Sequence, residues 1–189
     1  MRWNQHNNLL GKHAFLSPSG YHWLNYDNEK LKNVYLNKQK IEEGTKLHEL
    51  ASELIKRGIK VAKYKKTFNL FVNDCISFNM DSEVLLYYSD FCFGTADAIS
   101  FKDGKLKIFD LKTGATKASF NQLNIYAALF CLEYGMNPSD IWIMERIYQN
   151  NGFEEVIADP NEIISIIDKI IAFDVLLNEI INRGNESGQ

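Results

Sequence analysis

Two apolar runs that flank an Asp-Gly pair constrain the fold of this chain more than any other feature of its sequence. Together they make up residues 93–114, FGTADAISFKDGKLKIFDLKTG. The runs are rich in apolar and β-branched residues, and Asp-Gly is a preferred pair in hairpin turns. We therefore predict a β-hairpin. Its second strand carries Asp110 and Lys112 on one face, about 7 Å apart, because side chains two positions apart share a face.

A second carboxylate, Asp97, lies on the first arm of this hairpin. Two carboxylates beside an apolar core repel each other unless a cation neutralises them. Oxygen ligands with little sulfur or imidazole favour Mg²⁺ or Mn²⁺. Lys112 would then hold an attacking water or help to deprotonate it. The alternative interpretation is a hairpin with polar residues on its solvent-facing side, because an Asp-x-Lys triplet is common.

Two amphipathic runs lie on either side of the hairpin in the sequence. Residues 45–57 are predicted to form a helix that follows Gly44 and is separate from a charged helix at 29–43. Its inward-facing residues are expected to be Leu47, Leu50, Leu54 and Ile55. Residues 119–135 are predicted to form a second helix, in which Gln122 and Tyr126 lie one turn apart on the same face.

Four short motifs follow one another along the chain: Gly44-x-x-x-His48, Gly94-Thr-x-Asp97, Asp110-x-Lys112 and Gln122-x-x-x-Tyr126. Their order resembles that of the PD-(D/E)XK nuclease superfamily, in its RecB-like exonuclease branch. The chain length and the Gly-Thr-Ala-Asp hairpin are also similar to those of short phage-type members. The resemblance implies a restriction-endonuclease-like core and a metal-dependent deoxyribonuclease that hydrolyses phosphodiester bonds in DNA recombination, repair or processing.

The resemblance also implies roles for individual residues. Asp97 and Asp110 match the metal-binding acids, and the backbone carbonyl of Leu111 would complete the protein ligands of Mg²⁺ or Mn²⁺. Lys112 matches the catalytic lysine, and His48 matches a helix histidine that binds the metal or lies beside it. Gln122 and Tyr126 match a motif that positions the DNA strand near the scissile phosphate. In addition, Glu83 resembles an acid that some members carry, and we leave it out of the predicted site.

The chain departs from the family pattern at two places. Many relatives have an acid four residues after the helix histidine, where this chain has Ser52. Some relatives hold an iron–sulfur cluster through four cysteines. This chain has only three widely spaced cysteines in apolar surroundings, so we predict no iron–sulfur cluster.

The remaining segments predict the rest of an α/β fold. We expect a short helix in 16–26, a helix over 66–79 and a last helix from 159 to about 182. Predicted strands are 84–93, 141–148, which pairs parallel to the Asp110 strand, and 153–157, an edge strand. The result is a central mixed β-sheet flanked by helices.

The 189 residues fit a single domain, with an N-terminal helical segment (1–43), a catalytic core (44–158) and a C-terminal helix and tail (159–189). Charge is unevenly distributed. Residues 1–117 hold 18 Lys and Arg against 13 Asp and Glu, a balance of +5, whereas residues 118–189 hold 3 against 11, a balance of −8. The basic half favours DNA as a partner, either single strands or duplex ends.

The sequence shows no signal peptide and no membrane span, so we expect a soluble, cytoplasmic protein that does not associate with membranes. Three functions remain open. They are a DNA exonuclease, a structure-specific endonuclease with the same chemistry, and an inactive member that binds DNA or a protein, for example a recombination partner.

Overall fold

The computed structural model describes residues 14–62, 66–114 and 116–186. The chain divides into two compact units, Met1–Thr45 and Lys46–Gln189. In the first unit, the short helix expected within 16–26 is a 3-10 segment, Pro18–Asn25. The ring of Phe15 meets Tyr35 edge-on, with 5.1 Å between ring centroids. The second unit contains the sheet and all of the predicted site residues.

Helix α1 (Asn28–Lys56) runs without interruption through Gly44. The prediction of two helices separated at this glycine is therefore wrong. A glycine inside a helix costs about 1 kcal/mol relative to alanine. The flanking residues are mostly good helix formers, Lys, Glu and Leu among them, so this cost is smaller than that of ending one helix and nucleating another.

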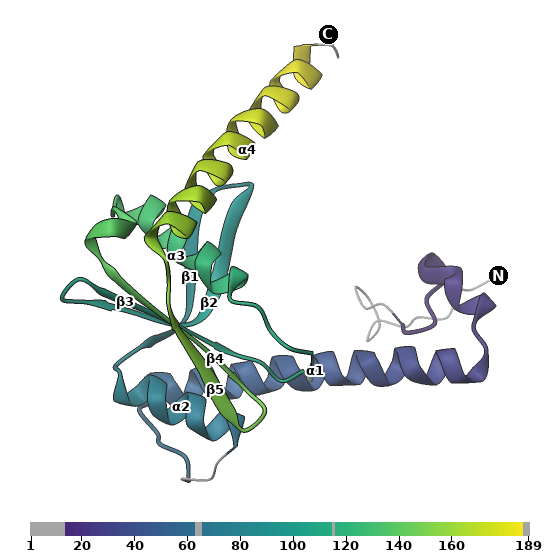
Figure 1. The fold of residues 1–189 in the computed structure, drawn as a ribbon. Coiled ribbons are helices and arrows are strands. Elements are labelled where there is room, and N and C mark those ends of the chain that lie inside the picture. The colour runs from purple at the N-terminus through teal and green to yellow at the C-terminus, as the bar shows by residue number, and fades with distance from the viewer. Residues whose placement is uncertain (1–13, 63–65, 115, 187–189) are drawn as a thin grey trace. The chain divides into compact units, whose positions relative to one another are not determined.

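The second unit is built on a five-stranded mixed sheet in the order β1-β2-β3-β4-β5 (Figure 1). All neighbouring strands are antiparallel except β3 and β4, which are parallel. Helix α3 (Asn121–Tyr134) connects that parallel pair. The predicted mixed sheet, the hairpin and the parallel pairing are confirmed. The strands are β1 (Asp81–Ser89), β2 (Cys92–Lys102), β3 (Lys105–Leu111), β4 (Trp142–Gln149) and β5 (Gly152–Ile157).

The predicted strand 84–93 has different bounds in the structure. Strand β1 begins at Asp81, and a turn at residues 90–91 separates it from β2. Because the run 84–93 is mostly apolar or aromatic, it does not reveal where one strand ends and the next begins. As a result Glu83 lies inside β1, not before it.

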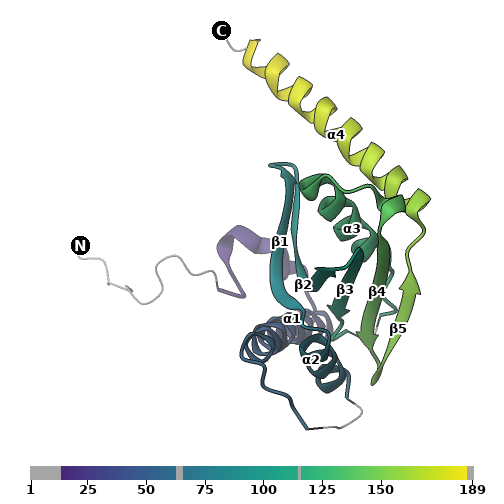
Figure 2. The same ribbon diagram turned by 90° about the vertical axis from the view of Figure 1, so that its left-hand side faces the viewer.

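Helices cover both faces of the sheet (Figure 2). Helices α3 and α4 (Pro160–Glu186) pack on one face, around Leu106, Ile108 and Ile143. Helix α2 (Thr67–Ser77) and residues 51–55 of α1 pack on the other face, around Phe109, Leu111 and Tyr148. Strand β3 alternates between these two cores, as a strand buried on both faces must. No helix in the described ranges has the length and apolar character that crossing a membrane requires.

The inward face of α1 differs in part from the one predicted. Ile55 is buried and Leu54 is partly buried, as predicted, but Leu47 and Leu50 are 38% and 49% exposed, and Ala51 and Ser52 are buried instead. The buried stripe is offset from the leucines by about one position, and it continues to His48, one turn before Ser52. The hydroxyl of Ser52 lies 3.0 Å from that of Ser82 on β1. The helix therefore approaches the sheet through small residues, which allow the two backbones to come close together.

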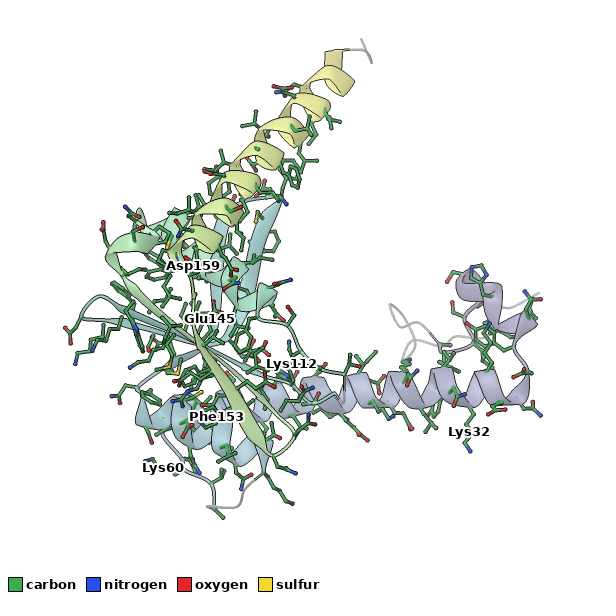
Figure 3. All side chains as sticks on the ribbon, in the orientation of Figure 1. Lys32, Lys60, Lys112, Glu145, Phe153 and Asp159 are labelled. Carbon is green, nitrogen blue, oxygen red and sulfur yellow. The ribbon has the colours of Figure 1, made fainter. Side chains whose placement is uncertain are left out.

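Glu145 on β4 is fully buried between the sheet and helices α3 and α4 (Figure 3). With its amide nitrogen turned inward, Asn124 of α3 donates to both carboxyl oxygens of Glu145, at 3.0 and 3.2 Å. Burial, with a smaller contribution from the charge of Glu162, raises the pKa of Glu145 to about 8. The folded protein therefore holds a proton here that the unfolded chain releases above its ordinary pKa.

This proton makes the stability of the fold depend on pH. Protonated Glu145 contributes to the free energy of unfolding. This contribution is fully present below pH 4.5 and is lost as pH rises through about 8, a change of at most about 5 kcal/mol. We predict that Glu145→Gln has little effect on the free energy of unfolding at pH 5 and increases it at pH 9. Urea unfolding at both pH values measures this difference. The control is Glu154→Gln on the exposed side of β5, and equal pH profiles for wild type and Glu145→Gln would contradict the prediction.

Candidate functional site

The pairing of β1 with β2 is interrupted at Glu83 and Asp97. The register runs through Ser82↔Ala98 and resumes at Val84↔Ala96, which leaves these two acids between the pairs. Glu83 has φ of 53°, a left-handed conformation that residues other than glycine rarely adopt within a strand. Such strained positions persist where the surrounding structure holds them, often at functional sites.

This interruption also changes which face of the sheet the flanking side chains reach. Ser82 and Ala98 face α1 and α2, whereas Val84 and Ala96 face α3. In a regular strand, residues two positions apart would share one face. The local twist therefore directs the side chains of Glu83 and Asp97 toward His48, at the end of the buried stripe of α1.

Asp97 connects three elements. Its Oδ2 accepts a hydrogen bond of 2.8 Å from the backbone N–H of Leu111, and its Oδ1 lies 3.2 Å from Nδ1 of His48. The β2–β3 register ends at Ala98↔Phe109, and one further step places Asp97 opposite Asp110. The two predicted acids are therefore neighbours across the hairpin. The side chain of Leu111 is buried in the core, and its carbonyl as a metal ligand stays a prediction.

A chain of hydrogen bonds extends from Asp110 to the backbone of β2. The amine of Lys112 donates to Oδ1 of Asp110 at 3.0 Å and to Oε1 of Gln122 at 2.7 Å. The amide of Gln122 donates to the hydroxyl of Tyr126 at 3.3 Å, and that hydroxyl donates to the carbonyl of Thr95 at 2.6 Å. Asp110 and Lys112 therefore share a side, as predicted, and α3 supplies two groups that hold Lys112.

Gly94 leaves room for this chain. A Cβ atom built at Gly94 would lie 3.1 Å from the ring of Tyr126. A larger residue would therefore displace the ring that carries the hydroxyl at the end of the chain. In the Gly94-Thr-x-Asp97 motif, the glycine thus allows the ring of Tyr126 to pack against the backbone of β2, and the aspartate supplies a carboxylate of the site.

The carboxylates crowd one another electrostatically. Burial, and next the charge of Asp97, raises the pKa of Asp110 and also that of Glu83. The hydrogen bond with Asp97 is the main cause that raises the pKa of His48. Each shift favours the protonated form of its group. A bound divalent cation would relieve the repulsion and release the protons, so metal affinity is expected to rise with pH.

The donor atoms fit a hard divalent cation. Ligand atoms of His48, Glu83 and Asp97 lie within 4.8 Å of one another, a group that contains no cysteine. Asp110 is outside this group, but its Oδ2 is buried and accepts no hydrogen bond from the part of the chain that the structure describes. An orphaned buried carboxylate oxygen that faces other acids is what an oxygen-coordinated Mg²⁺ or Mn²⁺ would satisfy. Glu83 was missing from the predicted ligands, and its only sequence signal was the family resemblance.

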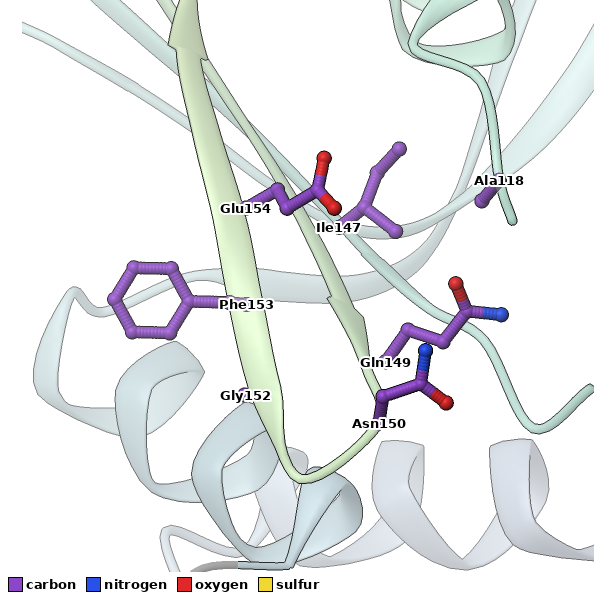
Figure 4. Close-up of a pocket in the computed structure, with 7 residues that line it drawn as sticks. All are labelled: Ala118, Ile147, Gln149, Asn150, Gly152, Phe153 and Glu154. Carbon is purple, nitrogen blue, oxygen red and sulfur yellow. The ribbon is translucent and has the colours of Figure 1, made fainter. Parts of the chain in front are cut away.

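Gln149, at the end of β4, is a second residue that sequence reasoning missed. Its side chain reaches toward the segment before α3 (Figure 4), and its amide donates to the carbonyls of Gly114 and Thr116, at 2.6 and 2.8 Å. The backbone N–H of Lys112 donates to the carbonyl of Tyr148 at 2.9 Å. Strand β4 thus holds the loop that begins at Lys112, beside a cavity of about 230 Å³. No local sequence signal marks this glutamine.

Comparison of the chain with models of protein families, with curated proteins and with solved structures gave no match.

The three cysteines of the chain lie apart in the fold. Cys75 is in the core between the sheet and α2, whereas Cys92 and Cys131 are on the opposite face.

We predict that Glu83→Gln weakens Mn²⁺ binding at least about ten-fold, because the amide cannot supply a charged ligand. Isothermal titration calorimetry with Mn²⁺ measures the dissociation constant, and the rise in Tm that Mn²⁺ causes is an independent measure of the same affinity. Glu53→Gln, on the exposed side of α1, serves as the control. An unchanged affinity in Glu83→Gln would remove Glu83 from the ligands.

Proposed function

We propose that this protein is a metal-dependent DNA exonuclease with a restriction-endonuclease-like core. One observation carries the proposal: the amine of Lys112 is held between Asp110 and Gln122, immediately beside the cluster of His48, Glu83 and Asp97. A lysine fixed next to a group of oxygen ligands is suited to hydrolysis of a phosphodiester at a bound metal ion.

The arrangement of the sheet supports the proposed core. The two acids lie on adjacent strands of a hairpin, β2 and β3, and the chain then crosses through α3 to the parallel strand β4. The same four motifs that resemble the RecB-like branch supply the residues of the site. Their site residues come from four elements, α1, β2, β3 and α3, and from the loop after β3, and the fold of the second unit brings them together.

His48, Glu83, Asp97 and Asp110, with the Leu111 carbonyl, are the groups that would hold Mg²⁺ or Mn²⁺. When bound, the ion would supply positive charge beside the scissile phosphate and lower the pKa of a coordinated water.

The protein's own groups position the other reactants. Lys112 donates to Asp110 and Gln122, which leaves its ammonium group able to donate one further hydrogen bond to an attacking water or to a phosphate oxygen. Gln122 and Tyr126, predicted to position DNA, are bonded to Lys112 and to Thr95 in this structure. Gln122 therefore holds the lysine and Tyr126 supports Gln122, and contact with DNA would come from the second N–H of the Gln122 amide.

DNA as the substrate is supported by the distribution of charge. The segment 1–117, with its balance of +5, includes His48, Asp97 and Lys112. Phosphate groups release counterions when they approach such a basic segment, which favours binding of a polyanion.

The decisive experiment is cleavage of end-labelled linear DNA, single- and double-stranded, and of a closed circle, with Mg²⁺, Mn²⁺ or EDTA. We expect metal-dependent loss of the linear substrates only. Lys112→Ala should reduce the rate by about 10²–10⁴-fold, because an ordered donor at the reacting atoms is lost.

Lys117→Ala, an exposed lysine in the same loop, is the matched control and should keep the wild-type rate. Cleavage of the circle would indicate an endonuclease. Binding of DNA without cleavage, under all metal conditions, would indicate an inactive binding protein. A full rate in Lys112→Ala would refute the assigned site.

Gln149 gives a separate prediction. Gln149→Leu keeps a side chain of similar size and removes both hydrogen bonds to the loop after Lys112, so Lys112 should lose its alignment. We expect kcat to fall by about 10–100-fold with an unchanged Mn²⁺ dissociation constant, because small misplacements reduce rate more than binding. A parallel loss of metal affinity would show instead that the whole site had been disturbed. Asn150→Ala, the neighbouring residue, is the control.

A further inference from the structure

One face of the β1–β2 hairpin is bare between its turn and the candidate site. Every second side chain in this part of the hairpin packs against α3, among them Leu86 and Ala96. The side chains between them point to the other face of the sheet: Leu85, Tyr87, Phe93 and Thr95. All four are exposed, because the core on that face reaches β2 only at Ala98 and the hairpin extends beyond α2 (Figure 2).

Two aromatic rings lie side by side on this bare face. Tyr87 and Phe93 are partners across the hairpin, with 6.3 Å between ring centroids and 26° between ring planes. Their side chains are 44% and 59% exposed. The hydroxyl of Tyr87 donates to Oδ1 of Asp90 at 3.0 Å, which holds its ring in place. Two exposed rings that are nearly parallel offer a surface on which another flat ring can stack.

The aromatic pair is continuous with the candidate site along both strands. The same face carries six residues that lead from the pair to the acids of the site: Phe93, Thr95 and Asp97 on β2, and Tyr87, Leu85 and Glu83 on β1. Four strand positions separate Phe93 from Asp97, a distance of about 13 Å. Stacked nucleotides are spaced about 3.4 Å apart along one strand. A strand with a phosphate at the acids would therefore bring a base roughly four nucleotides away onto the pair.

The charges around the pair favour a base over a phosphate. Residues 81–101 contain no lysine or arginine. Asp90 and Glu133 both accept hydrogen bonds from Tyr87, the first from its hydroxyl and the second from its backbone N–H. A phosphate would find only acids here, whereas a base is uncharged. Because the bases of a duplex are stacked on one another, only an unpaired base can lie flat on these rings, as in proteins that bind single strands.

We propose that Tyr87 and Phe93 stack on an unpaired base of the DNA strand that the candidate site cleaves, so that the substrate is single-stranded at this point. The inference rests on the proposed nuclease function, which supplies the DNA. Because the pair lies about 13 Å from Asp97, it binds the strand and takes no part in the chemistry. Loss of a ring should therefore weaken DNA binding and leave the affinity for Mn²⁺ unchanged.

Fluorescence anisotropy of a labelled single strand tests the pair. The strand has about 12 nucleotides, enough to span the site and the pair, and the full chain carries Lys112→Ala so that Mn²⁺ can be present without cleavage. Adding Phe93→Ala should raise the dissociation constant at least about ten-fold, because the stacked ring is lost. Phe93→Tyr should keep the affinity, because it keeps the ring. The fold-change should be the same at low and high salt, because stacking releases no counterions.

Phe101→Ala is the matched control. Phe101 is also a phenylalanine of β2 and is 39% exposed, but it packs against Phe130 of α3 on the opposite face, so this variant should bind the strand normally. The Tm of each variant shows that it is folded. An unchanged dissociation constant in Phe93→Ala would overturn the proposal. An equal loss of affinity for a blunt duplex of the same length would also overturn it, because the bases of that duplex are paired.

Cleavage by the chain with Lys112 intact separates this proposal from the nuclease function. Metal-dependent cleavage together with an unchanged dissociation constant in Phe93→Ala would reject the aromatic pair alone. Absence of cleavage together with weakened binding in Phe93→Ala would reject the nuclease and keep the pair as a binding site for single strands. Absence of any binding to the single strand would overturn the pair.

Discussion

The side chain of Asp97 occupies the position on which the rest of the site depends. Its carboxylate accepts the N–H of Leu111, in place of a main-chain acceptor on β2, and it contacts His48 on α1 with its other oxygen. At the same level, Glu83 and Asp97 are left unpaired in the β1–β2 ladder, and the backbone of Glu83 is left-handed. One irregularity in the sheet therefore concentrates three acids and a histidine that a regular ladder would distribute over two faces.

Lys112 is held by groups from several elements, which makes its position a property of the whole fold. Its amine donates to Asp110 and to Gln122 of α3, and its backbone N–H donates to the carbonyl of Tyr148 on β4. Tyr126 acts through Gln122, and Gln149 acts through the carbonyls of the loop that follows Lys112. Because each of these groups also makes a second contact or is buried, the lysine has little freedom to move away. Under the proposed function, this preorganisation is what Lys112 would need to act at a phosphate.

Helix α4 has two parts that differ in burial. Its first half completes the core over Ile143 and lies near the buried Glu145, whose protonation makes the stability of the fold depend on pH. Its second half leaves large apolar side chains exposed, among them Phe173 at 57% and Ile180 at 56%.

The sequence by itself determined the local elements and the order of the motifs. Period-two alternation and the Asp-Gly turn predicted the hairpin, and apolar runs at helical spacing predicted α2 and α3, because these signals depend only on neighbouring residues. The tertiary structure decided the break at Glu83, the burial of Ala51 and Ser52 instead of Leu47 and Leu50, and the role of Gln149. Each of these depends on contacts between segments tens of residues apart, which no local pattern encodes.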